Sequence, residues 1–189
     1  MPREMAVSAT TPSPGPAKGK GAAVRRLFGS IARRYDLANH LLSGGLDFWW
    51  RRRAAKIVRS WQPARVLDLA TGSGDLALAL SQACPDAEII GADFCLPMLL
   101  GARRKGLTKL IQADGMSLPL PDAAFDAVTI AFGLRNMESW ERGLAEIARV
   151  LRPGGHLLVL DFSIPHPPFL WLYRLYLHRI LPTFARLLT

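Results

Sequence analysis

At 189 residues, half of them hydrophobic, the chain is long enough for one domain with a sizeable core. Its two cysteines and four histidines show no spacing typical of metal ligands, so we expect no metal site and two free thiols in a reducing compartment. The first 23 residues lack the apolar stretch of a signal peptide, and no apolar run is long enough to span a bilayer. These features favour a cytoplasmic protein.

Positive charge is concentrated in the first third of the chain. Residues 1–59 hold 12 Lys and Arg against 3 Asp and Glu, which accounts for the whole net charge of +9. Such a segment favours an anionic partner, either lipid headgroups or nucleic acid. Charge alone does not choose between these two partners.

The amino-terminal region divides into two segments. Residues 1–23 are rich in Pro, Gly, Ser, Thr and Ala, which predicts a disordered tail. Residues 24–60 are basic and helical in character, with a second helix predicted from about Phe48 to Ser60, and we interpret them as a helical lid. The lid would begin a single domain over residues 24–189.

From residue 64 to residue 163, apolar runs alternate with helical patterns. The predicted strands are Arg65–Leu69, Glu88–Ala92, Lys109–Ala113, Phe125–Ala131 and His156–Phe162. The predicted helices are Leu76–Cys84, Pro97–Lys105 and Ser139–Leu151, the last ended by Pro153-Gly154-Gly155. This alternation predicts an α/β fold, a Rossmann-like parallel sheet with helices on both faces.

Residues 168–189 predict a final helix rich in Leu, Trp and Tyr with interspersed basic residues. Such a helix could pack on the sheet, line an apolar pocket for a long hydrocarbon chain, or lie at a membrane interface. We favour burial or pocket lining over direct membrane contact.

The strongest motif is the run from Asp68 to Asp75, where a strand becomes a helix. Gly72 and Gly74 would let the backbone pass close to a ligand, where a Cβ would clash. Asp93 follows at the end of the next strand, where a carboxylate can accept hydrogen bonds from both ribose hydroxyls of an adenosine cofactor.

Two cofactors are compatible with this motif. Gly72-x-Gly74-x-x-Ala77 also matches a dinucleotide fingerprint. Asp75, however, would lie in the first turn of the helix, where a dinucleotide places its pyrophosphate, and would repel it. S-adenosylmethionine has no phosphate and carries cationic amino and sulfonium groups, so Asp68 and Asp75 favour it.

A further strand end carries Asp114, Gly115 and Met116. The Asp114 side chain could hydrogen-bond an adenine amino group while Met116 packs on the ring. An Asp-Gly pair is also a common turn signal, and the two interpretations are equally supported.

Four stretches resemble the ubiquinone/menaquinone biosynthesis C-methyltransferases. They are Phe28-x-x-Ile31-Ala32-x-x-Tyr35-Asp36-Leu37-x-Asn39, Ala131-Phe132-Gly133-Leu134-Arg135-Asn136, Arg149-Val150-Leu151-Arg152-Pro153-Gly154-Gly155 and Leu160-Asp161-Phe162-Ser163. The resemblance covers about residues 24–189 and implies a class I S-adenosylmethionine-dependent methyltransferase domain with its cofactor-binding core at 64–163. It also implies cofactor contacts at Thr71, Asp93, Asp114 and Gly115. Similar proteins add two more strands to the sheet, which we expect this chain to lack.

Arg135 is the leading candidate for the essential residue at the methyl acceptor. It follows the strand Phe125–Ala131, and arginine is a poor base that can instead stabilise a forming phenolate and orient a water. Asn136 and Tyr35 could complete this polar set. The alternatives are a surface salt bridge for Arg135, a helix cap for Asn136 and a core aromatic for Tyr35.

The resemblance therefore implies C-methylation of a polyprenyl quinol precursor, with demethylmenaquinol favoured over the methoxy-benzoquinol of ubiquinone biosynthesis. Peripheral contact with the anionic inner face of a membrane would suit that substrate. An RNA methyltransferase is a second hypothesis, although no basic platform interleaved with aromatic residues is present. An inactive scaffold subunit of a quinone-synthesis assembly is a third.

Overall fold

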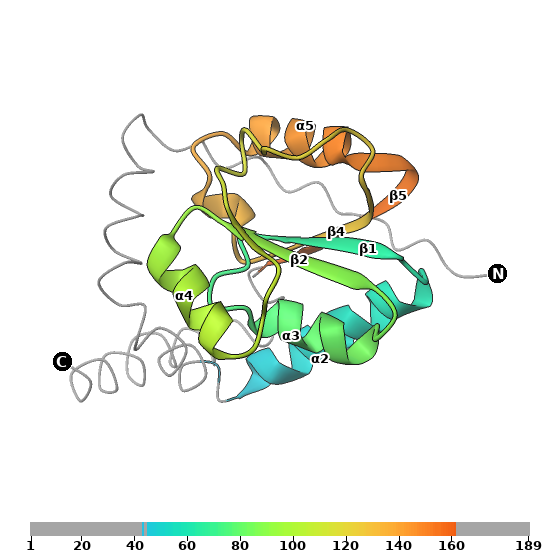
Figure 1. The fold of residues 1–189 in the computed structure, drawn as a ribbon, viewed down its shortest axis with the longest axis vertical. Helices are drawn as coiled ribbons and strands as arrows, with labels where there is room; N and C mark the ends of the chain where they lie inside the picture. Colours follow the sequence, from blue (N-terminus) through green and yellow to red (C-terminus); the bar gives the residue numbers. More distant parts are fainter. Residues whose placement is uncertain (1–42, 44, 162–189) are drawn as a thin grey trace, which may run out of the picture.

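A computed structural model describes residues 43 and 45–161 of the protein (Figure 1). Its centre is a five-stranded parallel sheet in the order β3-β2-β1-β4-β5. The strands are β1 (Arg65–Leu69), β2 (Glu88–Asp93), β3 (Leu110–Gln112), β4 (Phe125–Ala131) and β5 (Leu151–Leu160). The helices are α2 (Leu46–Ser60), α3 (Asp75–Ala83), α4 (Leu96–Arg104) and α5 (Trp140–Val150), with a short 3-10 helix, η1, at Leu134–Asn136.

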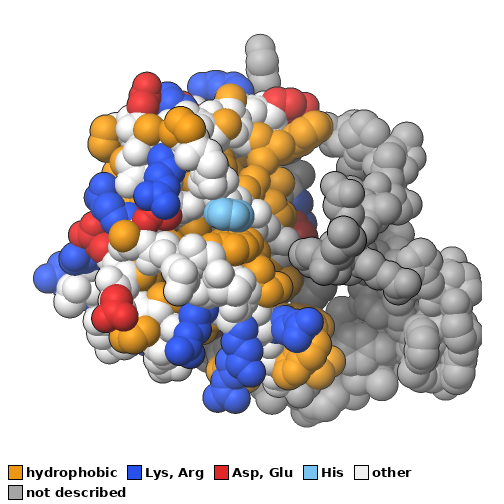
Figure 2. All heavy atoms as spheres, turned by 90° about the vertical axis from the view of Figure 1, so that its right-hand side faces the viewer, with side chains coloured by type: hydrophobic (Ala, Val, Ile, Leu, Met, Phe, Trp, Pro, Cys, Tyr) orange, Lys and Arg blue, Asp and Glu red, His pale blue; other side chains and the backbone are white. Residues whose placement is uncertain are grey.

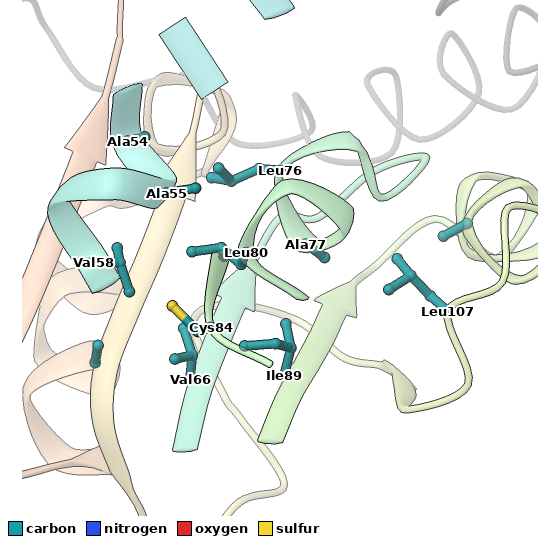
Figure 3. Close-up of a cluster of buried hydrophobic side chains, with 12 residues drawn as sticks. Ala54, Ala55, Val58, Val66, Leu76, Ala77, Leu80, Cys84, Ile89 and Leu107 are labelled. Atoms are coloured by element: carbon teal, nitrogen blue, oxygen red, sulfur yellow. The ribbon is translucent and has the colours of Figure 1, made fainter. Parts of the chain in front are cut away.

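Helices cover both faces of the sheet, as the sequence predicts. On one face α2, α3 and α4 enclose a core of buried side chains that includes Val58, Val66, Leu80 and Ile89 (Figure 3). On the other face α5 packs Ile147 and Val150 onto a second core. The strands β1, β2 and β4 are buried almost throughout, which explains why they read as continuous apolar runs rather than alternating ones.

The start of β5 differs from the prediction. Strand pairing begins at Leu151, directly after α5, and the ladder with β4 is interrupted between Phe125 and Ala127. The Pro153-Gly154-Gly155 segment therefore lies inside the strand as an irregularity, and Gly154 has a positive φ of 77°. A Pro-Gly-Gly run resembles a turn in sequence, yet a bulge in a strand at the edge of the described sheet accommodates the same residues.

One carboxylate fastens the amino-terminal ends of β1 and β4. Asp126 on β4 accepts hydrogen bonds from the backbone N–H groups of Ala64 and Arg65, at 2.6 and 2.8 Å. It also forms an ion pair with Arg152, at 2.5 Å. This contact holds the edge of the sheet opposite to the one that carries the candidate site.

Several predictions fall outside the described residues. They are the tail at 1–23, most of the lid at 24–60, Tyr35, and the helix at 168–189. The expected lack of two further strands also concerns the part of the chain after residue 161. Within residues 43 and 45–161, no helix is both long and apolar enough to cross a membrane.

Candidate active site

The candidate residues meet at one edge of the sheet because the strands are parallel. Thr71 follows β1, Asp93 ends β2, Asp114 follows β3 and Arg135 follows β4. The chain proceeds from β1 to β2 and β3 on one side, and β4 then returns to the other side of β1. Open α/β sheets bind ligands at the carboxyl ends of their strands, beside such a reversal.

The Asp93 carboxylate is buried and held by the backbone. Its Oδ2 accepts a hydrogen bond from the Gly72 N–H at 2.8 Å, and its Oδ1 accepts one from the Cys95 N–H at 2.8 Å. Burial raises the pKa of Asp93, and backbone hydrogen bonds from Cys95, Gly72 and Phe94 counteract part of that rise. A carboxylate offers about four acceptor positions, so it can still accept from a ligand hydroxyl.

Asp68 lies under the site and is almost fully buried. The Thr71 hydroxyl donates to its Oδ2 at 2.7 Å, and the Thr129 hydroxyl donates to its Oδ1 at 2.6 Å. The pKa of Asp68 is raised from 3.8 to about 6. Burial is the largest cause and nearby Asp93 adds to it, whereas the hydrogen bonds from the Thr129 and Thr71 hydroxyls lower the pKa. The floor of the site is therefore a buried carboxyl group that becomes ionised only as the pH rises past about 6.

The turn between β1 and α3 requires unusual backbone angles. Ala70, Gly72 and Gly74 have φ values of 54°, 57° and 85°, a region that non-glycine residues adopt at a cost. The Thr71 N–H donates to the Ala92 carbonyl at 3.0 Å, which ties this turn to β2.

Gly74 has a packing role rather than the expected role of opening the backbone to a ligand. A Cβ at Gly74 would lie 2.4 Å from the Leu107 Cδ1 and 2.9 Å from the Ala102 Cβ. The space beside Gly74 is therefore filled by α4 and the residues after it. A Cβ at Gly72 would meet only the Met98 Cε, at 3.4 Å, so Gly72 remains the candidate for a close ligand approach.

Asp75 does lie in the first turn of α3, but its charge is balanced. The Lys105 Nζ lies 2.6 Å from its Oδ1, and an Arg51 guanidinium nitrogen lies 3.7 Å from its Oδ2. Asp75 would therefore repel a pyrophosphate, or attract a cation, less strongly than an unpaired carboxylate would. Asp68 and Asp93 carry the electrostatic preference of the site instead.

Asp114 and Gly115 form a turn. The Asp114 Oδ1 accepts from the Met116 N–H at 2.9 Å, and the Asp114 carbonyl accepts from the Ser117 N–H at 3.0 Å. A Cβ at Gly115 would lie 2.7 Å from the Met137 Cε. The turn role of Asp114 is thus present in the structure, and its exposed side chain leaves the cofactor contact a prediction.

Arg135 lies on η1, directly beyond β4. Its guanidinium forms an ion pair with the Asp161 carboxylate and lies 5.7 Å from the centre of the Phe132 ring. The Arg135 side chain is 46% exposed. Asn136 caps the same turn, because its Nδ2 donates to the Phe132 carbonyl at 3.0 Å.

The loops after β1 and β4 touch one another. A Cβ at Gly133 would lie 2.4 Å from the Ala70 Cβ, so only glycine fits at this contact. The candidate cofactor side, around Thr71 and Asp93, is therefore adjacent to the loop that carries Arg135.

Two contributors were not predicted from the sequence. Thr129 is fully buried and stands opposite Asp68 in the pairing of β4 with β1. The signal in the sequence was that Thr129 is a hydroxyl residue within an otherwise apolar stretch of β4. Asp161 directly follows β5, and only the pairing of β4 with β5 brings it beside Arg135 on η1. The described residues contain no group of three or more His, Cys, Asp or Glu that could hold a metal ion.

Comparison with known proteins gives a consistent result. The model of the ubiE/COQ5 methyltransferase family matches residues 17–189. A demethylmenaquinone methyltransferase of Thermus thermophilus is 53% identical over 171 residues, which cover 86% of this chain and 77% of the relative. A protein of the same name from Deinococcus radiodurans is 46% identical over 184 residues, covering 94% of this chain and 76% of the relative.

Solved structures agree on the architecture. The [4+2]-cyclase SpnF superimposes with a TM-score of 0.63 at 25% identity, covering 83% of this chain and 66% of that protein. DesVI of Streptomyces venezuelae gives a TM-score of 0.59 at 26% identity, covering 71% and 58%. The expected fold class and the resemblance of the motifs are both confirmed. The chain belongs to the ubiE/COQ5 methyltransferase family and is a class I S-adenosylmethionine-dependent methyltransferase.

Proposed function

We propose that this protein methylates a ring carbon of a polyprenyl quinol, converting demethylmenaquinol to menaquinol. The observation that carries the proposal is the name shared by two relatives, demethylmenaquinone methyltransferase, at 53% and 46% identity. Another relative, from Geobacter sulfurreducens, is 43% identical and named a ubiquinone/menaquinone biosynthesis C-methyltransferase. The benzoquinol substrate of ubiquinone biosynthesis is therefore the alternative.

The residues at the carboxyl ends of β1 and β2 fit S-adenosylmethionine. Asp93 presents a carboxylate already oriented by two backbone N–H groups, as a pair of ribose hydroxyls requires. Asp68 supplies a buried negative charge below the turn that begins at Ala70, which suits a cationic ligand. When bound, S-adenosylmethionine supplies an electrophilic methyl group on a sulfonium.

The Arg135 turn suits the acceptor. Carbon methylation needs a quinol that has lost a hydroxyl proton, because the oxyanion raises electron density at the neighbouring ring carbon. Arg135, oriented by Asp161, would stabilise that oxyanion and hold the ring in line with the methyl group. Asn136 keeps the turn in shape through the Phe132 carbonyl, and Tyr35 would complete the polar set from the lid. The proton would leave through a water that Arg135 orients.

The partner and location follow from the substrate class. A polyprenyl quinol resides in a bilayer, so we also propose peripheral contact with the anionic, cytoplasmic face of a membrane. The charge of +9 carried by residues 1–59 supports that contact.

The test is methyl transfer by the purified full chain. Protein, S-adenosylmethionine with a labelled methyl group, and either demethylmenaquinol or its benzoquinol counterpart would be mixed in detergent, and the products identified by mass. We expect label on the naphthoquinol ring. Label on the benzoquinol alone would select the alternative substrate, and cofactor binding without transfer to either quinol would contradict the proposed function.

A further inference from the structure

The helix α2 has two different sides. Along most of its length the inner side carries small apolar residues, Ala54, Ala55 and Val58, which are buried where α2 packs against α3 and β5. This narrow contact anchors the helix to the sheet (Figure 3). The opposite side is left for solvent or for a partner.

The outer side of α2 combines a large aromatic residue with cations. Trp49, Arg52, Arg53 and Lys56 follow the i, i+3, i+4, i+7 spacing that places residues on one helix face, and all are exposed. Trp49 is 61% exposed, and the aliphatic Ile57 is 41% exposed on the flank of the same face. Lys and Arg side chains with hydrophobic ones beside them line the lower part of the molecule in Figure 2, at the height of α2 in Figure 1.

The positive charge of this face is not neutralised by neighbours. Among residues 43 and 45–161, no carboxylate lies within ion-pair distance of Arg52, Arg53 or Lys56. Arg51, which points inward, is instead paired with Asp47 on the same helix. The inward-pointing Arg51 is thus neutralised by a carboxylate of the same helix, whereas the outer cations of α2 are exposed.

The amino-terminal end of α2 adjoins the acceptor side of the candidate site. The Trp50 ring meets the Phe132 ring edge to face, with centroids 6.4 Å apart. Phe132 in turn lies under the Arg135 guanidinium. A partner bound to the outer face beside Trp49 would therefore lie close to the turn that we assign to the methyl acceptor.

We propose that the outer face of α2, formed by Trp49, Arg52, Arg53, Lys56 and Ile57, docks on an anionic bilayer surface. This inference rests on the proposed function, whose substrate is dissolved in lipid. Lys and Arg attract anionic headgroups, and tryptophan prefers the headgroup level of a bilayer. The aliphatic flank favours lipid, because Ile57 can enter the boundary between headgroups and acyl chains.

The experiment is vesicle binding by the full chain. Phosphatidylcholine vesicles with and without phosphatidylglycerol would be sedimented with the protein at several salt concentrations. We expect binding that requires phosphatidylglycerol and fades as salt rises. The double substitution Arg53→Gln/Lys56→Gln should weaken it about thirty-fold, and Trp49→Ala should weaken it while leaving the salt dependence in place.

The control is Lys109→Gln/Arg142→Gln, which also removes two positive charges but takes both from outside α2. Lys109 precedes β3, where it pairs with Glu88, and Arg142 lies on α5, on the opposite face of the sheet. We expect vesicle binding of this control to remain close to that of the wild type. Equal loss in both double variants, or equal binding to neutral vesicles, would overturn the proposal. So would unchanged binding after the α2 substitutions, or displacement of the protein from vesicles by an RNA homopolymer at lower concentration than by phosphatidylglycerol.

A second readout separates this proposal from the proposed function. The Arg53→Gln/Lys56→Gln variant should methylate a detergent-dispersed quinol at the wild-type rate and a vesicle-embedded quinol more slowly. Loss in detergent as well would show that the face serves the active site rather than the bilayer, and would overturn the docking proposal. Failure of the wild-type protein on every quinol, with vesicle binding intact, would instead contradict only the proposed function.

Discussion

Replacing Asp68 by asparagine tests the electrostatics of the site floor. The carboxylate is 1% exposed, and the hydroxyls of Thr71 and Thr129 donate to its two oxygens. An amide has nearly the same shape, and either threonine hydroxyl can rotate to accept from the new NH₂ group. The Asp68→Asn substitution therefore removes the charge while largely keeping the packing.

The size of the effect follows from the pKa. Folding raises the pKa of Asp68 from 3.8 to about 6, mainly through burial. The folded state thus binds the proton more tightly than the unfolded state, so the stabilisation from this proton is fully present below 3.8 and is lost as pH rises to about 6. The loss corresponds to about 3 kcal/mol of unfolding free energy. The Asp68→Asn variant should lack this loss.

The measurement is urea denaturation of both proteins, without cofactor, at intervals from about pH 4 to about pH 7. Relative to the wild type, the variant should gain about 3 kcal/mol across this range. Comparison of the two proteins removes the opposing contribution of Glu146, whose pKa its partner Arg149 lowers to about 2. Parallel curves for the two proteins would refute the raised pKa. Cofactor affinity provides a second observable, because wild-type binding should weaken below about pH 6 as Asp68 gains its proton.

Three further substitutions test separate parts of the site. Asp93→Ala should weaken S-adenosylmethionine binding ten-fold or more in calorimetry, because hydrogen bonds to a charged group contribute about 1.5–3 kcal/mol each; unchanged affinity in a folded variant would remove Asp93 from the site. Arg135→Ala should leave cofactor affinity nearly intact and lower methyl transfer by roughly 10²-fold, with little rescue by Arg135→Lys, which lacks the planar fork; full activity would assign the proton to another group. Gly74→Ala should lower the urea midpoint strongly, because its Cβ would lie 2.4 Å from the Leu107 Cδ1 in a backbone with φ of 85°; a midpoint like that of the wild type would show that α4 shifts freely.

Much of the sheet could be predicted because its inner strands are buried on both sides. The bounds of β1 and β4 match the prediction residue for residue, since long apolar runs flanked by polar residues leave few alternatives. The strand β3 is shorter than predicted, Leu110–Gln112, because it lies at the edge of the sheet formed by residues 45–161 and pairs there only with β2. At such an edge, pairing rather than hydrophobicity decides where a strand ends.

The position of a candidate site residue could be predicted where it follows from the strand pattern, and not where it depends on distant neighbours. The place of Asp93 at the end of β2 follows from that pattern, and its contact with the cofactor stays a prediction. The contacts of Gly74 and Asp75 could not be predicted in this way, because Leu107 and Lys105 reach them from thirty or more positions away in the chain. The ion pair between Arg135 and Asp161 likewise forms because β4 and β5 are neighbours in the sheet. The pattern of residues along the chain does not predict which strands are neighbours.

The contact of Asp126 with the start of β1 has a consequence for how the strands find their alignment. Parallel strands joined by hydrophobic residues alone can pair two positions out of step and still bury the same faces. Here Asp126 binds the N–H groups of Ala64 and Arg65, and Thr129 stands opposite Asp68 on the same pair of strands. A shift of two residues would break both contacts at once and leave buried polar groups unpaired, at about 1–3 kcal/mol for each. The two contacts lie near opposite ends of one strand pair and fix its register, so that the edge which carries the candidate site assembles in a single arrangement.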